Sequence, residues 1–315
     1  MKLSLTHYVL IVIVFSITAF LITPIFRSVA TKLNILDYPG GRKIQANPVA
    51  YLGGLAIITP ITIYSSMLIF SSISLDTKQQ IYLGLIIPSL MIAFVGLLDD
   101  IYQLPPWPRF ISQTSVGIVT SFMLYLSEAG VQIFNNQLLN SIATIFWVVV
   151  IINALNFIDN MDGLATNISI IASLTLSVIA YSNQQYLVSA LALAIFASCL
   201  GFLFWNKKPA SIYLGDAGAL YLGFLLAAIS IRIDFESNSV PVRVIVLLLV
   251  FIIPLFDTSQ VIVSRLLKSK SPFQGGRDHI SHIMLNYGLS ERLVLGLLTS
   301  FAIIFSMFAI ILILI

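Results

Sequence analysis

Two neighbouring carboxylates, Asp99 and Asp100, close an apolar stretch of this 315-residue chain and are its first candidates for chemistry. Adjacent carboxylates repel each other, which disfavours charge on both unless they share a cation. Acidic residues at the C-terminal end of a helix also oppose the helix dipole. A pair kept against both effects indicates a functional role, and the alternative is a helix end that simply faces water.

A second group of polar residues recurs every three positions: Asn153, Asn156, Asp159 and Asp162. On a helix this spacing places them along one side as a drifting stripe. Their hard oxygen atoms suit Mg²⁺ or Mn²⁺ rather than zinc, which prefers histidine and cysteine. The alternative is a polar seam that hydrogen-bonds a neighbouring helix.

A third group surrounds Asp216, which lies between Gly215 and Gly218 at the expected start of a helix. The glycines allow a ligand to approach the backbone, and Asp216 is also placed to act as a helix N-cap. Lys207 and Lys208 precede this group, either as phosphate contacts or as ordinary anchors at the membrane surface.

A fourth group, Arg277, His279 and His282, lies in the longest loop on the same side as the other three, where the alternative is an ordinary surface histidine pair. These side chains offer donors for phosphate, as does Lys43 nearer the N-terminus. Carboxylates fit for a divalent cation, together with basic donors, favour transfer of a phosphorylated group, because positioning and charge neutralisation supply most of the catalysis in such reactions.

Lipid must surround the elements that position these groups. Apolar residues make up 58% of the chain and charged residues 9%, against about 25% charged in soluble domains. A bilayer core of about 30 Å needs roughly 20 apolar residues per helix. The sequence therefore predicts an all-α, polytopic integral membrane protein with a single transmembrane catalytic domain over residues 1–315. Its ten expected helices cover 6–26, 50–70, 81–98, 110–126, 138–155, 164–181, 186–203, 217–233, 241–267 and 293–315.

Lysine and arginine set the expected orientation, because they collect in cytoplasmic loops. Of the 16 basic residues, all but Lys2, Lys78, Arg232 and Arg243 fall on one side of these ten helices. That side is predicted to be cytoplasmic and to carry the active site, and both termini are predicted to lie outside the inner (plasma) membrane. The sequence contains no basic run typical of nucleic-acid binding.

At these residues the chain resembles the polyprenyl-phosphate N-acetylhexosamine-1-phosphate transferases of glycosyltransferase family 4. The resemblance spans nearly the whole chain and rests on five motifs in the family's order. They are Arg42-Lys43 before Gly53-Gly54, the pair Asp99-Asp100, the segment 156–163, the segment 213–218 and the histidine loop.

The resemblance implies transfer of an N-acetylhexosamine 1-phosphate from a UDP-sugar to undecaprenyl or another polyprenyl phosphate, with release of UMP. This would be the first membrane step of a cell-envelope glycan. The implied cofactor is Mg²⁺, with Mn²⁺ as a substitute, and a homodimer is left open. Asp216 resembles the principal metal ligand, and Asp99 resembles the group that handles the lipid phosphate, with Asp100 beside it. Asp99 and Asp100 are the further candidate metal ligands.

The resemblance also assigns the substrate contacts. The nucleotide pocket would be walled by Asn156, Asp159 and Asp162, with Asn206 and Tyr213 near the uracil. The diphosphate or sugar would be contacted by Lys43 and His279, and Arg277 and His282 belong to the same loop. His279 is thereby a candidate catalytic residue with Asp99, Asp100 and Asp216.

Two departures bear on the sugar. Ser281 stands where the hexosamine branch usually has a histidine, and the three consecutive histidines of the muramoyl-pentapeptide branch are absent. UDP-N-acetylglucosamine is the expected donor, with phospho-N-acetylmuramoyl-pentapeptide transferase as the alternative enzyme. An ion-coupled transporter is the alternative of another class, but the acidic residues lie on one side and no two halves of the chain repeat each other.

The ninth expected helix, 241–267, is too long for a straight span. Its 27 residues would make about 40 Å of helix against an apolar core of about 30 Å. Pro254 lies inside it and cannot donate a helical hydrogen bond, and Asp257 follows to satisfy freed backbone groups. We predict a kink or break near Pro254, with the second half leaning toward lipid and opening a groove for the polyprenyl chain. The alternative is a straight, steeply tilted helix.

Overall fold

The computed structural model describes residues 3–38, 47–67, 82–126, 133–235, 239–271 and 276–314. Within these ranges the chain is mostly helical, as predicted. The helices are α1 (Leu5–Lys32), α2 (Gly53–Met67), α4 (Ile87–Tyr102), α5 (Pro106–Leu126), α6 (Gln137–Ile158), α7 (Leu164–Ser182), α8 (Tyr186–Asn206), α9 (Gly215–Arg232), α10 (Val240–Val250), α11 (Ile252–Leu267), α12 (Ile280–Asn286) and α13 (Glu291–Leu314). A π-helical turn, η2 (Tyr82–Ile86), leads into α4.

Two short strands add to the predicted all-helical fold. The strands β1 (Leu36–Asp37) and β2 (Val49–Ala50) pair antiparallel, with Leu36 opposite Ala50. Ala50 also bridges Ile212 in the segment before α9. This ladder was not predicted, because two-residue strands leave no alternating pattern to read in a sequence.

The number of membrane spans is smaller by strict criteria than the ten predicted. In the described part of the chain, seven helices are long and apolar enough to cross a membrane, and the pair α10–α11 makes eight if it counts as one span. The seven are α1, α4 with the end of η2, α6, α7, α8, α9 and α13. A helix also lies in each of the three remaining stretches, so the chain is a multi-pass membrane protein, and the count of ten stays a prediction.

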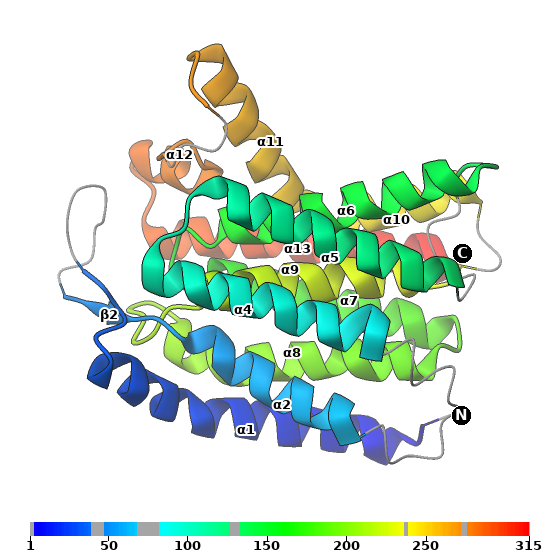
Figure 1. Cartoon of the computed structure of the whole chain (residues 1–315), viewed down its shortest axis with the longest axis horizontal. Coiled ribbons are helices and arrows are strands. Elements are labelled where there is room, and N and C mark those ends of the chain that lie inside the picture. The colour runs from blue at the N-terminus through cyan, green and yellow to red at the C-terminus, as the bar shows by residue number, and fades with distance from the viewer. Residues whose placement is uncertain are drawn as a thin grey trace.

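The ninth stretch consists of two helices at 77° to each other. The break lies at Phe251, three residues before Pro254. Pro254 therefore occupies the first turn of α11, where its missing N–H needs no helical partner. A continuous helix would drive its ring against the carbonyl of residue 250, the last residue of α10. In Figure 1, α11 leans away from the other helices.

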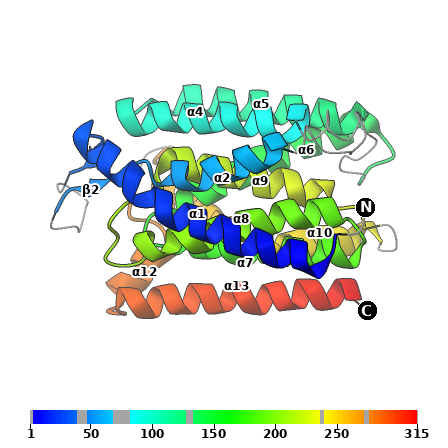
Figure 2. The same cartoon turned by 90° about the horizontal axis from the view of Figure 1, so that it is seen from below.

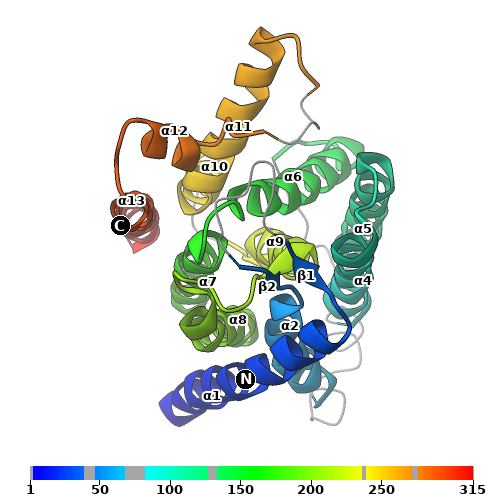
Figure 3. The same cartoon turned by 90° about the vertical axis from the view of Figure 1, so that its left-hand side faces the viewer.

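Helix α9 runs through the centre of the bundle. All its residues from Ala217 to Ile231 are buried, and the end-on view shows it enclosed by α2, α4, α6, α7 and α8 (Figure 3). Small residues permit such close packing of membrane helices. The start of α9, which carries Asp216, is thereby held between the ends of α4 and α6.

Successive long helices run in alternating directions, which brings alternate helix ends together. Figures 1 and 2 show both chain termini at one end of the bundle, and Figure 1 shows β2 and α12 at the other. The second end gathers the last turns of α4 and α6 and the first turns of α5 and α9. Three of the four polar groups singled out in the sequence belong to those turns.

Candidate active site

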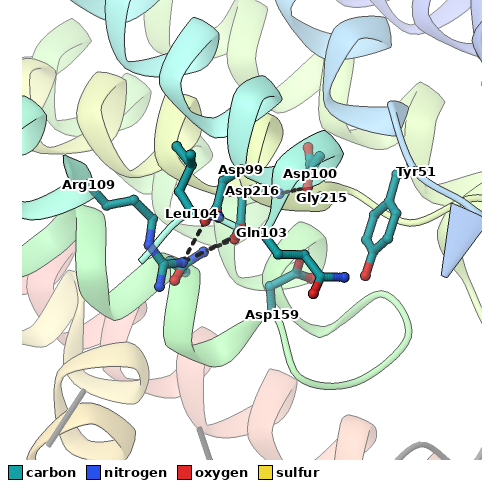
Figure 4. Close-up of a pocket in the computed structure, with 10 residues that line it drawn as sticks. Tyr51, Asp99, Asp100, Gln103, Leu104, Arg109, Asp159, Gly215 and Asp216 are labelled. Carbon is teal, nitrogen blue, oxygen red and sulfur yellow. Dashed lines mark hydrogen bonds and ion pairs between the residues drawn. The ribbon is translucent and has the colours of Figure 1, made fainter. Parts of the chain in front are cut away.

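A cavity of about 440 Å³ opens at this end of the bundle. It is lined by residues of α4, α5, α6 and α9, of the segments that follow α4 and α6, and of the segment between β2 and α2. Figure 4 shows these residues converging on one space. The lining residues are Tyr51, Asp99, Asp100, Gln103, Leu104, Arg109, Asn156, Asp159, Gly215 and Asp216. Four of them are carboxylates and one is a cation.

Asp99 is buried and held from two sides. Its Oδ1 accepts a hydrogen bond from the backbone N–H of Leu104 at 2.6 Å. Its Oδ2 forms an ion pair with Arg109 Nη1 at 2.7 Å. The chain can turn back onto Asp99 because Gln103 ends α4 in the left-handed conformation. The carboxylate therefore has one oxygen fixed by its own turn and one directed toward a cation.

Asp100 caps the start of α9. Its Oδ1 accepts from the backbone N–H of Asp216 at 2.7 Å and its Oδ2 from that of Ala217 at 3.1 Å. A carboxylate at a helix N-terminus satisfies free N–H groups and complements the helix dipole. Gly215 leaves room for it, with a φ of +73° and with a would-be Cβ only 2.7 Å from Asp100 Oδ2. Asp100 is thus a positioning group for Asp216.

The close approach of α4 to α9 depends on Gly96. A Cβ at this position would lie 2.5 Å from the carbonyl oxygen of Asp216 and 2.6 Å from Ala217. We expect Gly96→Ala to push the two helices apart and to lower both the melting temperature and the activity, because backbone atoms cannot rotate away from the clash. Gly296→Ala in α13 is the matched control, since a Cβ there meets nothing within 4 Å. Thermal unfolding in detergent compares the two variants, and equal melting temperatures would contradict the assignment.

Asp216 is contacted from two other helices. Asn156 of α6 donates its side-chain N–H to Asp216 Oδ1. Arg109 of α5 places Nη1 3.7 Å from Asp216 Oδ2 while it pairs with Asp99. One guanidinium therefore lies between two carboxylates, where it offsets their mutual repulsion (Figure 4).

Asp159 follows α6 and is the fourth acidic side chain in the cavity. Desolvation, reinforced by the nearby carboxylates of Asp216 and Asp162, raises its pKa to about 8. A desolvated carboxylate with no cation beside it favours its neutral form, and the neighbouring carboxylates of Asp216 and Asp162 act in the same direction. Four carboxylates and one arginine line the cavity, and a cation beside them would favour their charged forms.

The two other residues of the predicted stripe, Asn153 and Asp162, form hydrogen bonds within the protein. Asn153 donates to Gln113 Oε1 of α5 at 2.6 Å. For this residue the structure therefore shows the alternative interpretation, a polar contact between two helices. Asp162 accepts from the backbone N–H of Ala210 at 3.0 Å and so holds the segment that leads into α9. Only Asn156 and Asp159 of the four line the cavity.

Tyr51 lines the cavity from the segment between β2 and α2. Its hydroxyl donates to Asp37 Oδ1 at 2.9 Å, and its ring centroid lies 6.0 Å from that of Tyr213. Burial, with the charge of Asp37 second, raises the pKa of the Tyr51 hydroxyl. Tyr213 itself donates its backbone N–H to Ala50 at 2.8 Å, which joins the entrance of α9 to β2.

The remaining predicted residues lie outside the cavity lining. Asn206 is buried, accepts from Thr166 at 2.7 Å and donates to the carbonyl of Ile212 at 3.1 Å, so its amide is used within the protein. His279 is buried and pairs with Asp257, and its ring centroid lies 6.0 Å from that of His282.

The other predicted basic residues, His282, Arg277 and Lys43, differ in their surroundings. Burial, with His279 and Arg277 as further causes, lowers the pKa of His282. Arg277 itself is exposed. Lys43 lies outside the described residues. The structure thus brings Asp99, Asp100, Asp216, Asn156 and Asp159 together and leaves the histidine loop as a separate group.

Three polar residues of the cavity are not among the predicted site residues: Tyr51, Gln103 and Arg109. Arg109 was read only as a cytoplasmic anchor. Its position could have indicated a role in the site, because Arg109 lies ten residues after Asp99, at the start of the next helix. Two antiparallel helices place the end of the first and the start of the second at the same end of the bundle. Tyr51 and Gln103 carried no comparable signal, because isolated polar and aromatic residues at helix ends are common.

The donor chemistry of the cavity fits a magnesium ion. Within the described residues, no three His, Cys, Asp or Glu side chains form a group arranged to hold a metal. Mg²⁺ does not need such a cage, because it usually binds one or two carboxylates and completes its shell with water and phosphate oxygens. Asp99 Oδ2 is buried and, apart from the Arg109 ion pair, accepts no hydrogen bond in the described chain. Asp99 and Asp216 are the matching pair of carboxylates.

The multi-pass helical fold and the acidic cavity fit a membrane-embedded phosphoglycosyl transferase, and comparison with known proteins indicates this class. Residues 82–234 match the sequence profile of glycosyl transferase family 4. The chain is 32% identical over 305 residues to a probable undecaprenyl-phosphate N-acetylglucosaminyl 1-phosphate transferase of Bacillus subtilis, which covers 95% of this chain and 83% of that protein. The chain therefore belongs to glycosyl transferase family 4, which confirms the resemblance indicated by its motifs.

Two further relatives have related names. A decaprenyl-phosphate N-acetylglucosaminephosphotransferase of Mycolicibacterium smegmatis is 28% identical over 84% of this chain and 72% of its own length. An undecaprenyl-phosphate alpha-N-acetylglucosaminyl 1-phosphate transferase of Escherichia coli is 27% identical over 90% of this chain and 79% of its own length.

Proposed function

We propose that this chain transfers N-acetylglucosamine 1-phosphate from UDP-N-acetylglucosamine to a polyprenyl phosphate. In this reaction an oxygen of the lipid phosphate forms a bond to the β-phosphorus of the nucleotide sugar. The bond between that phosphorus and the bridging oxygen breaks, and UMP leaves. The observation that carries the proposal is the cavity in which Asp99, Asp216 and Arg109 converge, and the names of the relatives support the choice of sugar and lipid.

The charge of the cavity explains which partners the reaction needs. Four carboxylates and one arginine line it, so a diphosphate and a lipid phosphate would meet net repulsion on entry. A divalent cation bound here would offset this repulsion and the charge that develops on the transferring phosphoryl group. We assign Asp216 and Asp99 as the residues that hold Mg²⁺, or Mn²⁺ in its place.

The protein's own residues would position the two substrates. Arg109 faces both metal-binding carboxylates and is suited to a phosphate oxygen, because guanidinium groups match phosphate geometry. Asp99 orients the lipid phosphate and accepts its proton when one is present. Asp100, through the α9 amides, fixes the place of Asp216. Asn156 and Asp159 form the wall of the nucleotide site, and Tyr51 lines the same cavity.

The remaining roles concern the ends of the substrates. Tyr213 is assigned to the uracil end. His279, Arg277 and His282 are assigned to the sugar or diphosphate, and so is Lys43. Asp162 and Asn206 support these residues through their hydrogen bonds to the segment before α9. The site is assigned to the cytoplasmic face of the inner membrane, where UDP-sugars are made, and the polyprenyl chain to the side on which α11 leans away.

A panel of donors tests the proposed sugar. Purified protein with undecaprenyl phosphate and Mg²⁺ is expected to convert UDP-N-acetylglucosamine faster than UDP-N-acetylgalactosamine. UDP-N-acetylmuramoyl-pentapeptide is expected to give no lipid-linked product. Thin-layer separation of the lipid products measures each rate, and a preference for the pentapeptide donor would overturn the proposed specificity.

A further inference from the structure

Asp257 of α11 is a fully buried carboxylate outside the cavity. Both of its oxygens contact the residues at the start of α12. Its Oδ2 lies 2.8 Å from Nδ1 of His279. Its Oδ1 accepts from the backbone N–H of Ile280 at 2.7 Å. Asp257 was expected to satisfy backbone groups freed by Pro254, but it instead holds the ring and the backbone at the start of α12.

The carboxylate of Asp257 determines which ring nitrogen of His279 carries a proton. A carboxylate only accepts hydrogen bonds, so the His279 nitrogen that faces Asp257 must carry a proton. The backbone N–H on Oδ1 fixes the carboxylate plane and prevents a rotation that would release the ring. Nδ1 of His279 is therefore protonated whether the imidazole is neutral or charged, and the protonation of Nε2 alone distinguishes those two states.

Other contacts hold the same loop in place. Arg265, two turns further along α11, pairs with Asp278 at 3.3 Å, and Lys268 pairs with it at 2.9 Å. Hydrogen bonds from Lys268 foremost, and then from Arg265, lower the pKa of Asp278.

Ser281, two residues after His279, donates to Asn160 Oδ1 at 2.5 Å and ties α12 to the turn after α6. The ring of Phe157 meets that of His279 edge to face, with centroids 6.1 Å apart. Arg265, Lys268 and Asn160 thus share with Asp257 the task of holding this segment, whereas the hydrogen bond to Nδ1 of His279 comes from Asp257.

We propose that Asp257 is a positioning residue that fixes His279 as the Nδ1-protonated tautomer, so that Nε2 is the nitrogen presented away from α11. The importance of this for turnover rests on the proposed function, in which His279 contacts the sugar or diphosphate. The tautomer itself does not rest on it. Carboxylate partners that fix histidine in this way are a common support for functional imidazoles.

Nitrogen-15 NMR of histidine-labelled protein in nanodiscs tests the tautomer directly. The chain has only three histidines, His7, His279 and His282, so His7→Gln and His282→Gln assign the signals. Above the pH at which the imidazoles lose their charge, His279 is expected to keep its proton on Nδ1. A wild-type His279 with the proton on Nε2 would overturn the proposal without any variant.

Asp257→Asn is the matching variant. The Ile280 N–H keeps the amide oxygen as its acceptor, so the new NH₂ group faces His279 and donates to Nδ1. The ring proton is then expected on Nε2, and Nε2 changes from an acceptor to a donor. Thr258→Val is the control, because Thr258 is a buried neighbour whose hydroxyl has no hydrogen-bond partner in the described chain, and it should leave the His279 signals unchanged.

Kinetics separate this inference from the proposed function. Asp257→Asn is expected to lower kcat about 10- to 100-fold, the usual cost of losing such a partner, with a similar melting temperature and Thr258→Val near wild type. If the tautomer moves but the wild-type protein does not act on UDP-N-acetylglucosamine, the proposed function fails and the positioning role stands. If the wild type is active and His279 keeps its Nδ1 proton in Asp257→Asn, the positioning role fails alone.

Discussion

Asp216→Asn is expected to lower the turnover of UDP-N-acetylglucosamine by about 10²- to 10³-fold, the cost of removing one preorganised charge-stabilising group. The substitution keeps the shape of the side chain and its backbone contact with Asp100 while it removes the charge that we propose to hold Mg²⁺. The melting temperature should change little, because the amide still fits beside Asn156 and Arg109. Steady-state rates at increasing Mg²⁺ concentration measure the effect, which added metal should only partly reverse.

The control for this variant is Asp234→Asn, which removes an exposed carboxylate just beyond the other end of α9. It should leave the rate unchanged. Excess chelator should stop the wild-type reaction, and Mg²⁺ should restore it. A near-normal rate for Asp216→Asn, or for the wild type in chelator, would refute the assignment of Asp216 as the metal-binding carboxylate.

Asp99→Asn is expected to lower kcat by about 10²-fold or more while the affinity for the nucleotide sugar stays near that of the wild type. The amide oxygen can still accept from Leu104, but the new NH₂ group faces Arg109 and can no longer accept a proton from the lipid phosphate. A group that acts on the second substrate in the transition state gives this pattern when it is lost.

Separate measurements of kcat and of UDP-N-acetylglucosamine binding distinguish the possible roles of Asp99. Calorimetric titration gives the affinity in the absence of lipid. Parallel losses of affinity and of kcat would place Asp99 in the nucleotide site instead. An unchanged kcat would show that its ion pair with Arg109 has no part in turnover.

The sequence was most informative where chemistry and helix ends coincide. Asp99, Asp100, Asp216, Asn156 and Asp159 were predicted to act together, and the alternating helices bring them to one cavity. Helix positions followed from apolar length alone, since each predicted stretch contains a helix. The family, too, was predictable from the order of the motifs.

What the sequence left open depends on which way each side chain points. Asn153 and Asn156 lie three residues apart, yet one faces Gln113 and the other Asp216, because a three-residue step turns only 300° around a helix and the stripe drifts. Asn206 looked like a substrate contact and is used inside the protein. Arg109 was overlooked because the pairing of α5 with α4 gives it a role that no local pattern contains.

The position of the break before α11 shows how a local rule can locate a feature only approximately. Proline predicts a disrupted helix, but the disruption falls at Phe251, so that Pro254 can occupy the first turn of the next helix. The same geometry places Asp257 one turn into α11, where it reaches His279. Sequence reasoning could not pair these two residues, because the pairing depends on the fold of the loop between α11 and α12.

The identity of the released nucleotide tests the central claim most directly. Purified protein with UDP-N-acetylglucosamine and undecaprenyl phosphate should release one UMP for each lipid-linked sugar formed, and the lipid product should carry a diphosphate that contains the sugar's original phosphorus. Chromatography of the nucleotides, with a donor labelled at the β-phosphorus, measures both. Release of UDP, with the label left on the nucleotide, would mean that the sugar moves without its phosphate and would contradict the account.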